Sequence, residues 1–236
     1  MNLTRNFICA GVVVMLCLMP AALMAEGGQA VSQDMLIFSG AIVDKVPGVG
    51  KISASPGGRN IMGQGDSVYI RTDIPAVQGA MFYVLDGPEK IIHPATHCFV
   101  GYLVRIKGIV VVAGEEGGDE KAVVVKSFKE INLNDLLGEY YPVAQVKLRG
   151  QKPAGIKGVI VGLTDEKIVA GGGNIVYLDK GAADGVAAGD LFDVASGEKP
   201  NFPAGVIQVI HVQSRTSTAL IRKSRDAIRP GDSFGN

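Results

Sequence analysis

The sequence predicts an all-β protein made of two tandem, small antiparallel barrel-like modules after an N-terminal signal peptide. Three observations predict this fold class. Short β-branched segments bounded by turn residues recur, helical periodicity is not sustained over more than two turns, and one pattern of segments occurs twice. The chain has 32 glycines and only 6% aromatic residues, so each module is expected to have a modest aliphatic core.

The repeat is clearest in two tyrosine-bearing segments. Gly65–Arg71 resembles Gly173–Asp179, and in each half a glycine-bearing loop then leads to Phe-X-Val, at Phe82 and at Phe192. Three more pairs follow in the same order: Gly101–Ile106 with Gly205–Ile210, Ala122–Ser127 with Ala219–Ser224, and Ile131–Asp135 with Ile228–Asp232. A duplicated unit of this kind indicates a scaffold before it indicates catalysis.

The offset between the copies falls in steps along the chain. It is 110 residues at Phe82, 104 at Gly101 and 97 at Ser127. We therefore expect the first copy to carry 6 extra residues before Gly101 and 7 more between Gly101 and Ser127. Both places are rich in turn formers, which is where loop insertions are tolerated.

The first 25 residues are predicted to be a signal peptide. Arg5 supplies one positive charge, an apolar run extends from Phe7 to Leu18, and small residues precede a cleavage point after Ala25. A retained membrane anchor is the alternative, because the apolar run approaches the roughly 20 residues that span a bilayer. Pro20 and the small residues favour removal.

The remaining chain divides into four predicted parts: a flexible leader (26–34), a first β module (35–138), a linker (139–155) and a second β module (156–236). Pro142 and Pro153 lie in the linker, where a proline removes a donor from any sheet ladder. The strands expected from β-branched content are Met35–Val43, Val68–Arg71, Met81–Leu85, Val100–Ile106, Ile109–Val112, Ala122–Ser127, Ile156–Leu163, Ile175–Leu178, Leu191–Val194, Gly205–Gln213 and Thr218–Lys223.

Charge and cysteine usage exclude several classes of protein. The chain carries 23 basic and 23 acidic residues and has no basic cluster, so we expect no nucleic-acid partner and no membrane contact except through an uncleaved N-terminal segment. Cys98 is the one cysteine outside the signal peptide, so no intrachain disulfide is expected. We expect it to be a small buried side chain, since free cysteine is among the most buried residue types, and the alternative is an intermolecular bridge or a reactive thiol.

Histidines and acidic residues offer few candidates for a metal site. His93 and His97 are four residues apart, but Pro94 and the β context argue against the helix that would bring them together, and His211 is the one further histidine of the chain. Glu115–Glu120 lacks the alternating ligands of a calcium loop and is expected to be a solvated hairpin tip. We predict no metal and no cofactor.

Catalytic motifs are equally sparse. The chain has no Gly-X-Ser-X-Gly elbow, and Ser214 and Ser217 alternate on a strand near a histidine without forming a triad pattern. Asp190 and Asp232 each follow a glycine, so we expect their carboxylates to cap backbone amides in turns. Gly171–Gly173 precedes a strand rather than a helix and is expected to be a turn, not a phosphate cradle. The sequence therefore predicts that the protein is not an enzyme.

Several segments together resemble known envelope proteins. They are His93–His97, Gly101-Tyr102, Lys126–Ile131, Ala170–Leu178, Thr216–Ser224 and Gly231-Asp232. Residues 36–234 resemble the region that follows the lysin motif in a group of bacterial envelope proteins, and the last module is similar to the C-terminal domain of flagellar assembly protein T. The resemblance implies a noncatalytic protein of the periplasm or outer envelope whose β modules mediate assembly. Proteins of that group usually begin with a peptidoglycan-binding lysin motif, and residues 26–35 are too few for one, so we expect wall contact through a partner or none.

We therefore predict a noncatalytic structural or adaptor protein of the bacterial cell envelope, exported to the periplasm or the outer envelope, that docks other envelope proteins through exposed strand edges and loops. The long insertions of the first module are the predicted partner surface: His93, His97, Cys98, Phe99, Glu115, Glu116 and Lys121. One alternative is a protein that binds or hydrolyses peptidoglycan or polysaccharide in a cleft between the modules. The other is an assembly factor for a flagellum or pilus.

Overall fold

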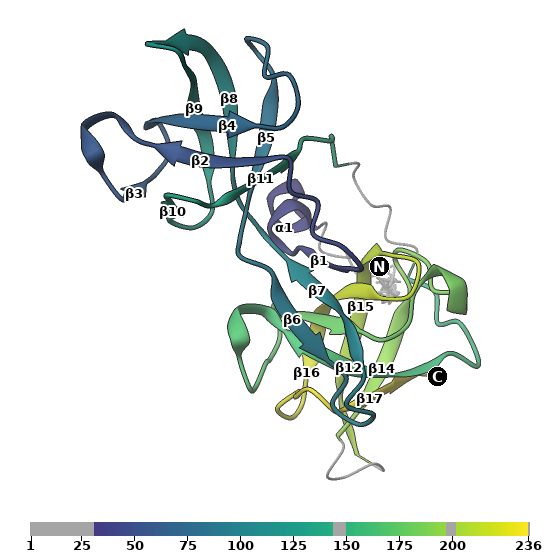
Figure 1. The fold of residues 1–236 in the computed structure, drawn as a ribbon. Coiled ribbons are helices and arrows are strands. Elements are labelled where there is room, and N and C mark those ends of the chain that lie inside the picture. The colour runs from purple at the N-terminus through teal and green to yellow at the C-terminus, as the bar shows by residue number, and fades with distance from the viewer. Residues whose placement is uncertain (1–30, 144–149, 197–201, 236) are drawn as a thin grey trace, which may run out of the picture.

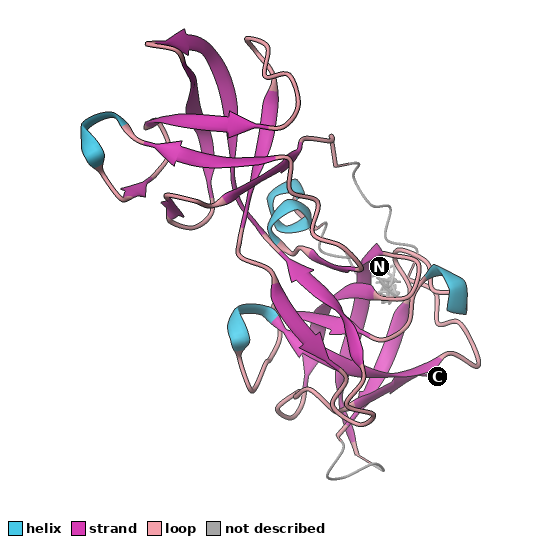
Figure 2. Ribbon diagram, in the orientation of Figure 1, coloured by secondary structure: helices cyan, strands magenta, loops and turns pink. Residues whose placement is uncertain are grey.

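The computed structural model of the chain describes residues 31–143, 150–196 and 202–235 (Figure 1). The predicted signal peptide and residues 26–30 of the predicted leader lie outside these ranges. The all-β prediction is confirmed, because two closed, six-stranded antiparallel barrels follow one another along the chain (Figure 2). Among the described residues, no helix is long and apolar enough to cross a membrane.

Barrel 1 closes in the strand order β11-β2-β4-β9-β8-β5. Its strands are β2 (Gly50–Ala54), β4 (Ser67–Thr72), β5 (Met81–Leu85), β8 (Ile106–Glu116), β9 (Asp119–Ser127) and β11 (Leu136–Glu139). The turn η1 (Pro56–Gly58) and a short pair, β3 (Ile61–Met62) with β10 (Ile131–Asn132), lie beside it. Aliphatic residues and Phe82 fill the interior, as the composition predicts.

Barrel 2 closes in the order β12-β13-β16-β15-β14-β17. Its strands are β12 (Lys157–Leu163), β13 (Ile175–Leu178), β14 (Leu191–Ala195), β15 (Pro203–Val212), β16 (Ser217–Ser224) and β17 (Ser233–Gly235), with turns η2 (Thr164–Glu166) and η3 (Ala182–Asp184). Its interior contains the ring pair Phe192 and Phe234, with centroids 5.2 Å apart. Because the barrel is closed, the order can be started at β17, and β17-β12-β13-β16-β15-β14 then matches the order of barrel 1 strand for strand.

The strand registers show that the two barrels are copies of one unit. Tyr69 pairs with Lys121 as Tyr177 pairs with Thr218. The bulges recur as well: β8 and β9 shift register after Ile109, and β15 and β16 shift after Val206, at the equivalent step. Because register is set independently at each turn, this agreement around both barrels supports the predicted duplication.

One part of the predicted alignment is wrong. β15 corresponds to β8 and not to the segment that begins at Gly101, because β15 pairs with β14 as β8 pairs with β5. Gly205 therefore matches Gly108, and the offset falls once, from 110 at Val84 to 97 at Gly108. The first copy carries a single insertion of 13 residues, the difference between those offsets, and this insertion is a hairpin.

The inserted hairpin and the N-terminal segment form a third sheet. Its strands are β1 (Ala41–Val43), β6 (Glu89–Ile92) and β7 (Phe99–Val104), in the order β1-β7-β6. Ile42, Ile91 and Leu103 of this sheet pack on the outer face of barrel 2, and all three are nearly or fully buried there. The hairpin leaves barrel 1 and extends along barrel 2 (Figure 1), so it joins the two barrels.

A short helix, α1 (Gln33–Phe38), replaces the beginning of the predicted strand Met35–Val43. Ser32 caps it by accepting a hydrogen bond from the Met35 amide. Leu36 packs toward barrel 2 and Ile37 toward barrel 1. Six residues are too few to show helical periodicity, so the strand prediction for residues 35–38 was wrong for lack of a signal.

The outer faces of the two barrels differ where the third sheet lies. On barrel 2 that face carries Val161 and Ile175, which are buried beneath the sheet. The equivalent positions of barrel 1 are Ser53 and Ser67, which are partly exposed. A polar surface offers little free energy for burying a sheet, so the sequence of each copy fits its own surroundings.

Candidate functional site: the junction between the barrels

Three hydroxyl groups of barrel 2 donate hydrogen bonds to carbonyl oxygens of the N-terminal segment. Tyr177 donates to Ser39 at 2.7 Å, Thr218 to Gly40 at 3.0 Å and Thr216 to Ile42 at 3.2 Å. The Tyr177 side chain is fully buried, and burial raises its pKa to about 12, so its hydroxyl remains a donor at physiological pH. These bonds occupy carbonyls on β1 and the residues that lead into it.

A network of ion pairs lies where the inserted hairpin leaves barrel 1. Arg105, at the bend between β7 and β8, contacts Asp86 at 3.3 Å and Glu89 at 3.1 Å. Lys107 contacts both carboxylate oxygens of Asp135 at 3.0 Å. Arg105 is 6% exposed and Lys107 is 9% exposed. Burial of two positive charges to this extent is tolerated because each side chain has carboxylate partners.

Lys129 extends this network from the first module to barrel 2. Its ammonium group lies 3.5 Å from Asp86 and 2.5 Å from Asp165 in η2. Partial burial acts to raise the pKa of Asp165, but the hydrogen bond and the charge of Lys129 outweigh it, so the pKa is lowered. The barrels are thus connected by an apolar interface, by hydroxyl–carbonyl hydrogen bonds and by charge.

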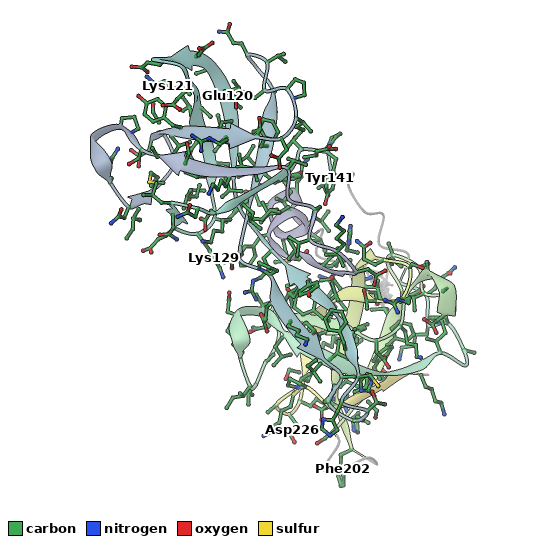
Figure 3. All side chains as sticks on the ribbon, in the orientation of Figure 1. Glu120, Lys121, Lys129, Tyr141, Phe202 and Asp226 are labelled. Atoms are coloured by element: carbon green, nitrogen blue, oxygen red, sulfur yellow. The ribbon has the colours of Figure 1, made fainter. Side chains whose placement is uncertain are left out.

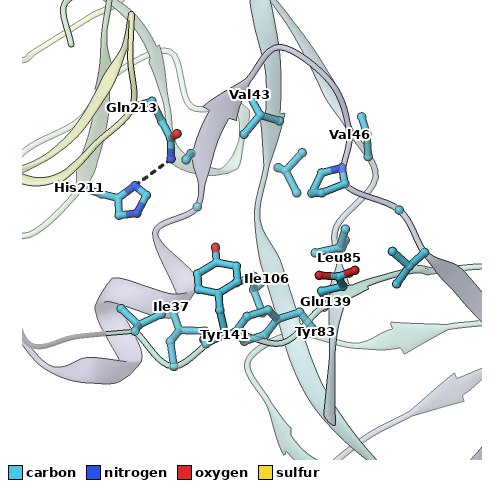
Figure 4. A pocket seen from close by; sticks show the side chains of 18 of the residues that line it. Ile37, Val43, Val46, Tyr83, Leu85, Ile106, Glu139, Tyr141, His211 and Gln213 are labelled. Atoms are coloured by element: carbon cyan, nitrogen blue, oxygen red, sulfur yellow. Dashed lines mark hydrogen bonds between the residues drawn. The ribbon is translucent and has the colours of Figure 1, made fainter. Parts of the chain in front are cut away.

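A cavity of about 570 Å³ lies beside these contacts (Figure 4). Residues from α1, β1, the loop after β1, barrel 1 and the end of β15 line it. The lining is mainly aliphatic, and Tyr83, Tyr141, His211 and Gln213 contribute aromatic or polar groups. Tyr83 donates a hydrogen bond to the Tyr141 carbonyl at 2.6 Å, which fixes the backbone that positions the Tyr141 ring.

His211 and Gln213 form the polar side of the cavity. The Gln213 amide nitrogen lies 3.3 Å from Nδ1 of His211. Desolvation by burial lowers the pKa of His211, so the imidazole is neutral at physiological pH. In Figure 4 the Tyr141 ring points from the opposite wall toward His211.

The residues of the predicted partner surface lie in two separate places. His93, His97, Cys98 and Phe99 are at the tip of the β6–β7 hairpin, next to barrel 2. Glu115, Glu116 and Lys121 are at the β8–β9 hairpin, at the far end of barrel 1, where Figure 3 labels Lys121. The structure therefore does not bring these two tips together. The prediction that both are insertions is wrong for the β8–β9 hairpin, because the β15–β16 hairpin of barrel 2 matches it in length.

Within the β6–β7 tip, the side chains differ in their surroundings. Nε2 of His93 lies 3.4 Å from Asp179 of barrel 2, and its Nδ1 accepts hydrogen bonds from the Ala95 and Thr96 amides. His93 thus helps to hold the hairpin on barrel 2. Cys98 is exposed, so the expectation of a buried thiol is wrong, because within the described part of the chain the turn at the hairpin tip packs against no other element at this position. His97 is also exposed, and Phe99 is 47% exposed. His97, Cys98 and Phe99 therefore form the solvent-accessible part of the tip.

At the β8–β9 hairpin, Lys121 forms an ion pair with Glu116 at 2.5 Å, and Glu115 is exposed. Gly117 and Gly118 both have positive φ and make the turn that the sequence predicted. Within the described ranges, no group of three or more histidine, cysteine, aspartate or glutamate side chains is arranged to hold a metal ion.

The predicted turn-capping roles of aspartates are confirmed. Asp190 accepts from the Ala187 amide and Asp232 from the Arg229 amide, both at 2.8 Å. Asp135 accepts from the Asn132 amide at 2.7 Å in the equivalent turn of barrel 1. Ser217 donates to the Lys180 carbonyl at 2.8 Å, so its hydroxyl has a structural partner.

Sequence reasoning missed the junction itself. A signal was present in Val104–Lys107, where two basic residues alternate with aliphatic ones in a β-branched run. Charged residues within an apolar strand are rarely buried unless paired, so the pattern indicated an internal ion-pair network. Nothing local indicated that His211 and Tyr141 line one cavity, because Tyr141 lies in the predicted linker and His211 in the second module.

No family model matches the chain, and no curated protein matches it. The likeness to the region after the lysin motif, and to flagellar assembly protein T, remains a prediction from the sequence.

Proposed function

We propose that this protein is a noncatalytic scaffold or adaptor of the bacterial cell envelope, which holds two docking surfaces at a fixed spacing. The observation that carries the proposal is that the one large difference between the two copies, the 13-residue hairpin, lies across the barrel junction. An insertion used in this way stabilises the position of one barrel relative to the other. Fixed geometry between two ends is what a scaffold requires.

The ends of the molecule carry exposed apolar side chains suited to partner contact. Val77 is 67% exposed in the loop between β4 and β5 of barrel 1. Ile168 is 81% exposed and Phe202 is 68% exposed in loops of barrel 2, where Figure 3 labels Phe202 far from Lys121. Such residues on loops of a rigid scaffold are typical binding positions.

The closed barrels change the expected mode of docking. Strands within a closed barrel have no free edge, so addition of a partner strand to the barrels is not part of the proposal. The outer carbonyls near β1 are occupied by the hydroxyls of barrel 2. Contact through loop and hairpin tips, including His97, Cys98, Phe99 and Glu115, therefore replaces strand addition as the proposed mechanism.

The proposal includes export to the periplasm or outer envelope, which is supported by the signal-like residues 1–25. The proposed partners are other envelope proteins, among them peptidoglycan-associated ones. An assembly role in a flagellum or pilus would use the same surfaces with a different partner.

Site-specific photo-cross-linking in native envelopes tests the adaptor proposal. A photoreactive residue is placed at His97 or at Glu115, and the control position is Val125, which is 42% exposed on the wall of barrel 1. We expect a defined envelope protein to be captured from at least one tip and not from Val125. Equal capture from all three positions, or hydrolysis of purified peptidoglycan by the protein, would contradict the proposal.

The hydrolase alternative draws less support from the cavity between the modules. Such chemistry commonly uses two carboxyl groups that flank the bond to be cleaved. The lining of the cavity includes one carboxylate, Glu139, and one imidazole, His211. Figure 4 draws these groups on opposite sides of the cavity, with the Tyr141 ring between them. The arrangement fits ligand binding better than hydrolysis.

A further inference from the structure

We propose that the junction cavity binds a single-chain amphiphile, a molecule with an aliphatic chain and a small hydrogen-bonding head group. This inference does not depend on the adaptor role, because it concerns a different surface. The size of the cavity, the chemistry of its walls and the polarity of its entrance support it.

The cavity walls suit an aliphatic chain. The volume of about 570 Å³ lies within the range of pockets that hold small organic ligands, about 300–1,000 Å³. Apolar side chains from four segments of the chain line most of it: Leu36, Ile37, Val43, Val46, Val49, Leu85, Val104 and Ile106. Water in such a space finds few hydrogen-bond partners, whereas each buried methylene of a ligand contributes about 0.8 kcal/mol.

The polar side of the cavity suits a small head group. Nδ1 of His211 lies next to the Gln213 amide. Nε2 of His211 has no hydrogen-bond partner among the residues that the structure describes, and no side-chain nitrogen or oxygen there is both fully buried and unpaired. Nε2 is therefore reachable by a ligand. Tyr141 approaches from the other side, so a hydroxyl or carboxyl group between them can donate or accept.

The entrance carries no net charge. Lys45 and Glu139 both line the cavity and are both exposed, so one positive and one negative group face solvent at its edge. A polyanionic ligand such as a nucleotide would find one cation opposed by one anion. A neutral or singly charged head group matches this balance.

The same region disfavours a peptide strand as the occupant. A strand that docks beside β1 needs free backbone groups, but the Gly40 and Ile42 carbonyls already accept hydrogen bonds from Thr218 and Thr216. An amphiphile needs only apolar contact along its chain and one or two hydrogen bonds at its head. An amphiphile is therefore the occupant that complements both the apolar walls and the polar side of the cavity.

Fluorescence titration of the purified protein with dansyl-undecanoic acid tests the proposal. We expect saturable binding with one probe per chain, displaced by dodecanoic acid or dodecanol; the better competitor identifies the preferred head group. The cavity-filling variant is Val46→Trp, in the loop after β1 (Figure 4), and its matched control is Val77→Trp on an exposed loop of barrel 1. Far-UV circular dichroism and urea unfolding establish that both variants fold.

Val46→Trp is expected to weaken binding by about tenfold or more, which is about 1.4 kcal/mol, and Val77→Trp by less than about twofold. His211→Leu keeps the cavity apolar and is expected to weaken both competitors by about threefold or more, while folding is retained. Absence of saturable binding, or equal affinities of the two tryptophan variants, overturns the proposal. Displacement of the probe by an apolar peptide but not by dodecanoic acid or dodecanol also overturns it, because the site would then take a protein anchor.

Discussion

Replacing Gly108 by alanine is expected to strain barrel 1 in the same way that replacing Gly205 strains barrel 2. An alanine Cβ at Gly108 would lie 2.5 Å from the Lys126 carbonyl oxygen and 2.9 Å from Cδ1 of Ile131. At Gly205 it would lie 2.4 Å from the Lys223 carbonyl oxygen and 3.1 Å from Cδ1 of Ile228. The two glycines meet equivalent atoms because they occupy equivalent positions of a duplicated unit.

The expected magnitude follows from these distances. Real Cβ atoms almost never approach other heavy atoms within 3.0 Å, so the neighbouring strand must move by at least about half an ångström. Overpacking of this kind costs about 1–3 kcal/mol, and the loss of chain entropy in the unfolded state returns about 0.4–1 kcal/mol. We therefore expect each variant to lose about 1–2 kcal/mol, and the double variant to lose about the sum, since the sites share no contact.

Urea unfolding followed by far-UV circular dichroism measures this loss, since the chain has no tryptophan for fluorescence. Gly172→Ala is the matched control, because nothing lies within 4 Å of its added Cβ. The control is expected to change stability by less than about 0.5 kcal/mol. If Gly108→Ala unfolds at the same urea concentration as the control while Gly205→Ala does not, the two glycines do not occupy equivalent positions. That result would contradict the duplication.

Three further predictions concern the junction. Lys107→Met leaves the largely buried Asp135 carboxylate without its cation and is expected to cost about 3 kcal/mol in urea unfolding. Lys152→Met, in an exposed ion pair, is expected to cost less than about 1 kcal/mol, and equal losses in the two variants would contradict a larger contribution from the buried pair. Burial lowers the pKa of His211 below 6.5, so as the pH falls the unfolded chain takes up a proton at a higher pH than the folded chain does. The free energy of unfolding is therefore expected to decrease as the pH drops below about 6.5. In a series of urea unfolding curves at different pH values, this decrease should be absent in His211→Gln and present in His97→Gln. Tyr177→Phe leaves the buried carbonyl at the end of α1 unpaired and is expected to lower the free energy of unfolding by about 1–3 kcal/mol, and an unchanged urea midpoint would argue against that hydrogen bond.

Much of the fold could be read from local patterns. Val68–Arg71 and Ile175–Leu178 are β-branched runs between glycine turns, and the structure places strands at both. Gly65 and Gly173 have φ of 90° and 84°, as turns into the two tyrosine-bearing strands require. Such signals depend on residues close in sequence, so they can be recognised without knowledge of the tertiary structure.

The insertion was misplaced because apolar strands look alike in sequence. Gly101–Ile106 and Gly108–Glu116 both begin with glycine and contain several aliphatic residues, so either could match the strand that starts near Gly205. Hydrogen bonding between β5 and β8 decides between them. That pairing joins residues separated by a hairpin, and its register cannot be read from either segment alone.

The sequence by itself determined the class of fold, the duplication of the barrel and the turn roles of aspartates such as Asp190, because each follows from the spacing of a few neighbouring residues. Tertiary structure alone decided that the β6–β7 hairpin lies across barrel 2, that Arg105 and Lys107 are buried with partners, and that His211 and Tyr141 line one cavity. These outcomes depend on contacts between segments that are distant in the chain, and the free energy of such a contact belongs to the pair of surfaces rather than to either segment.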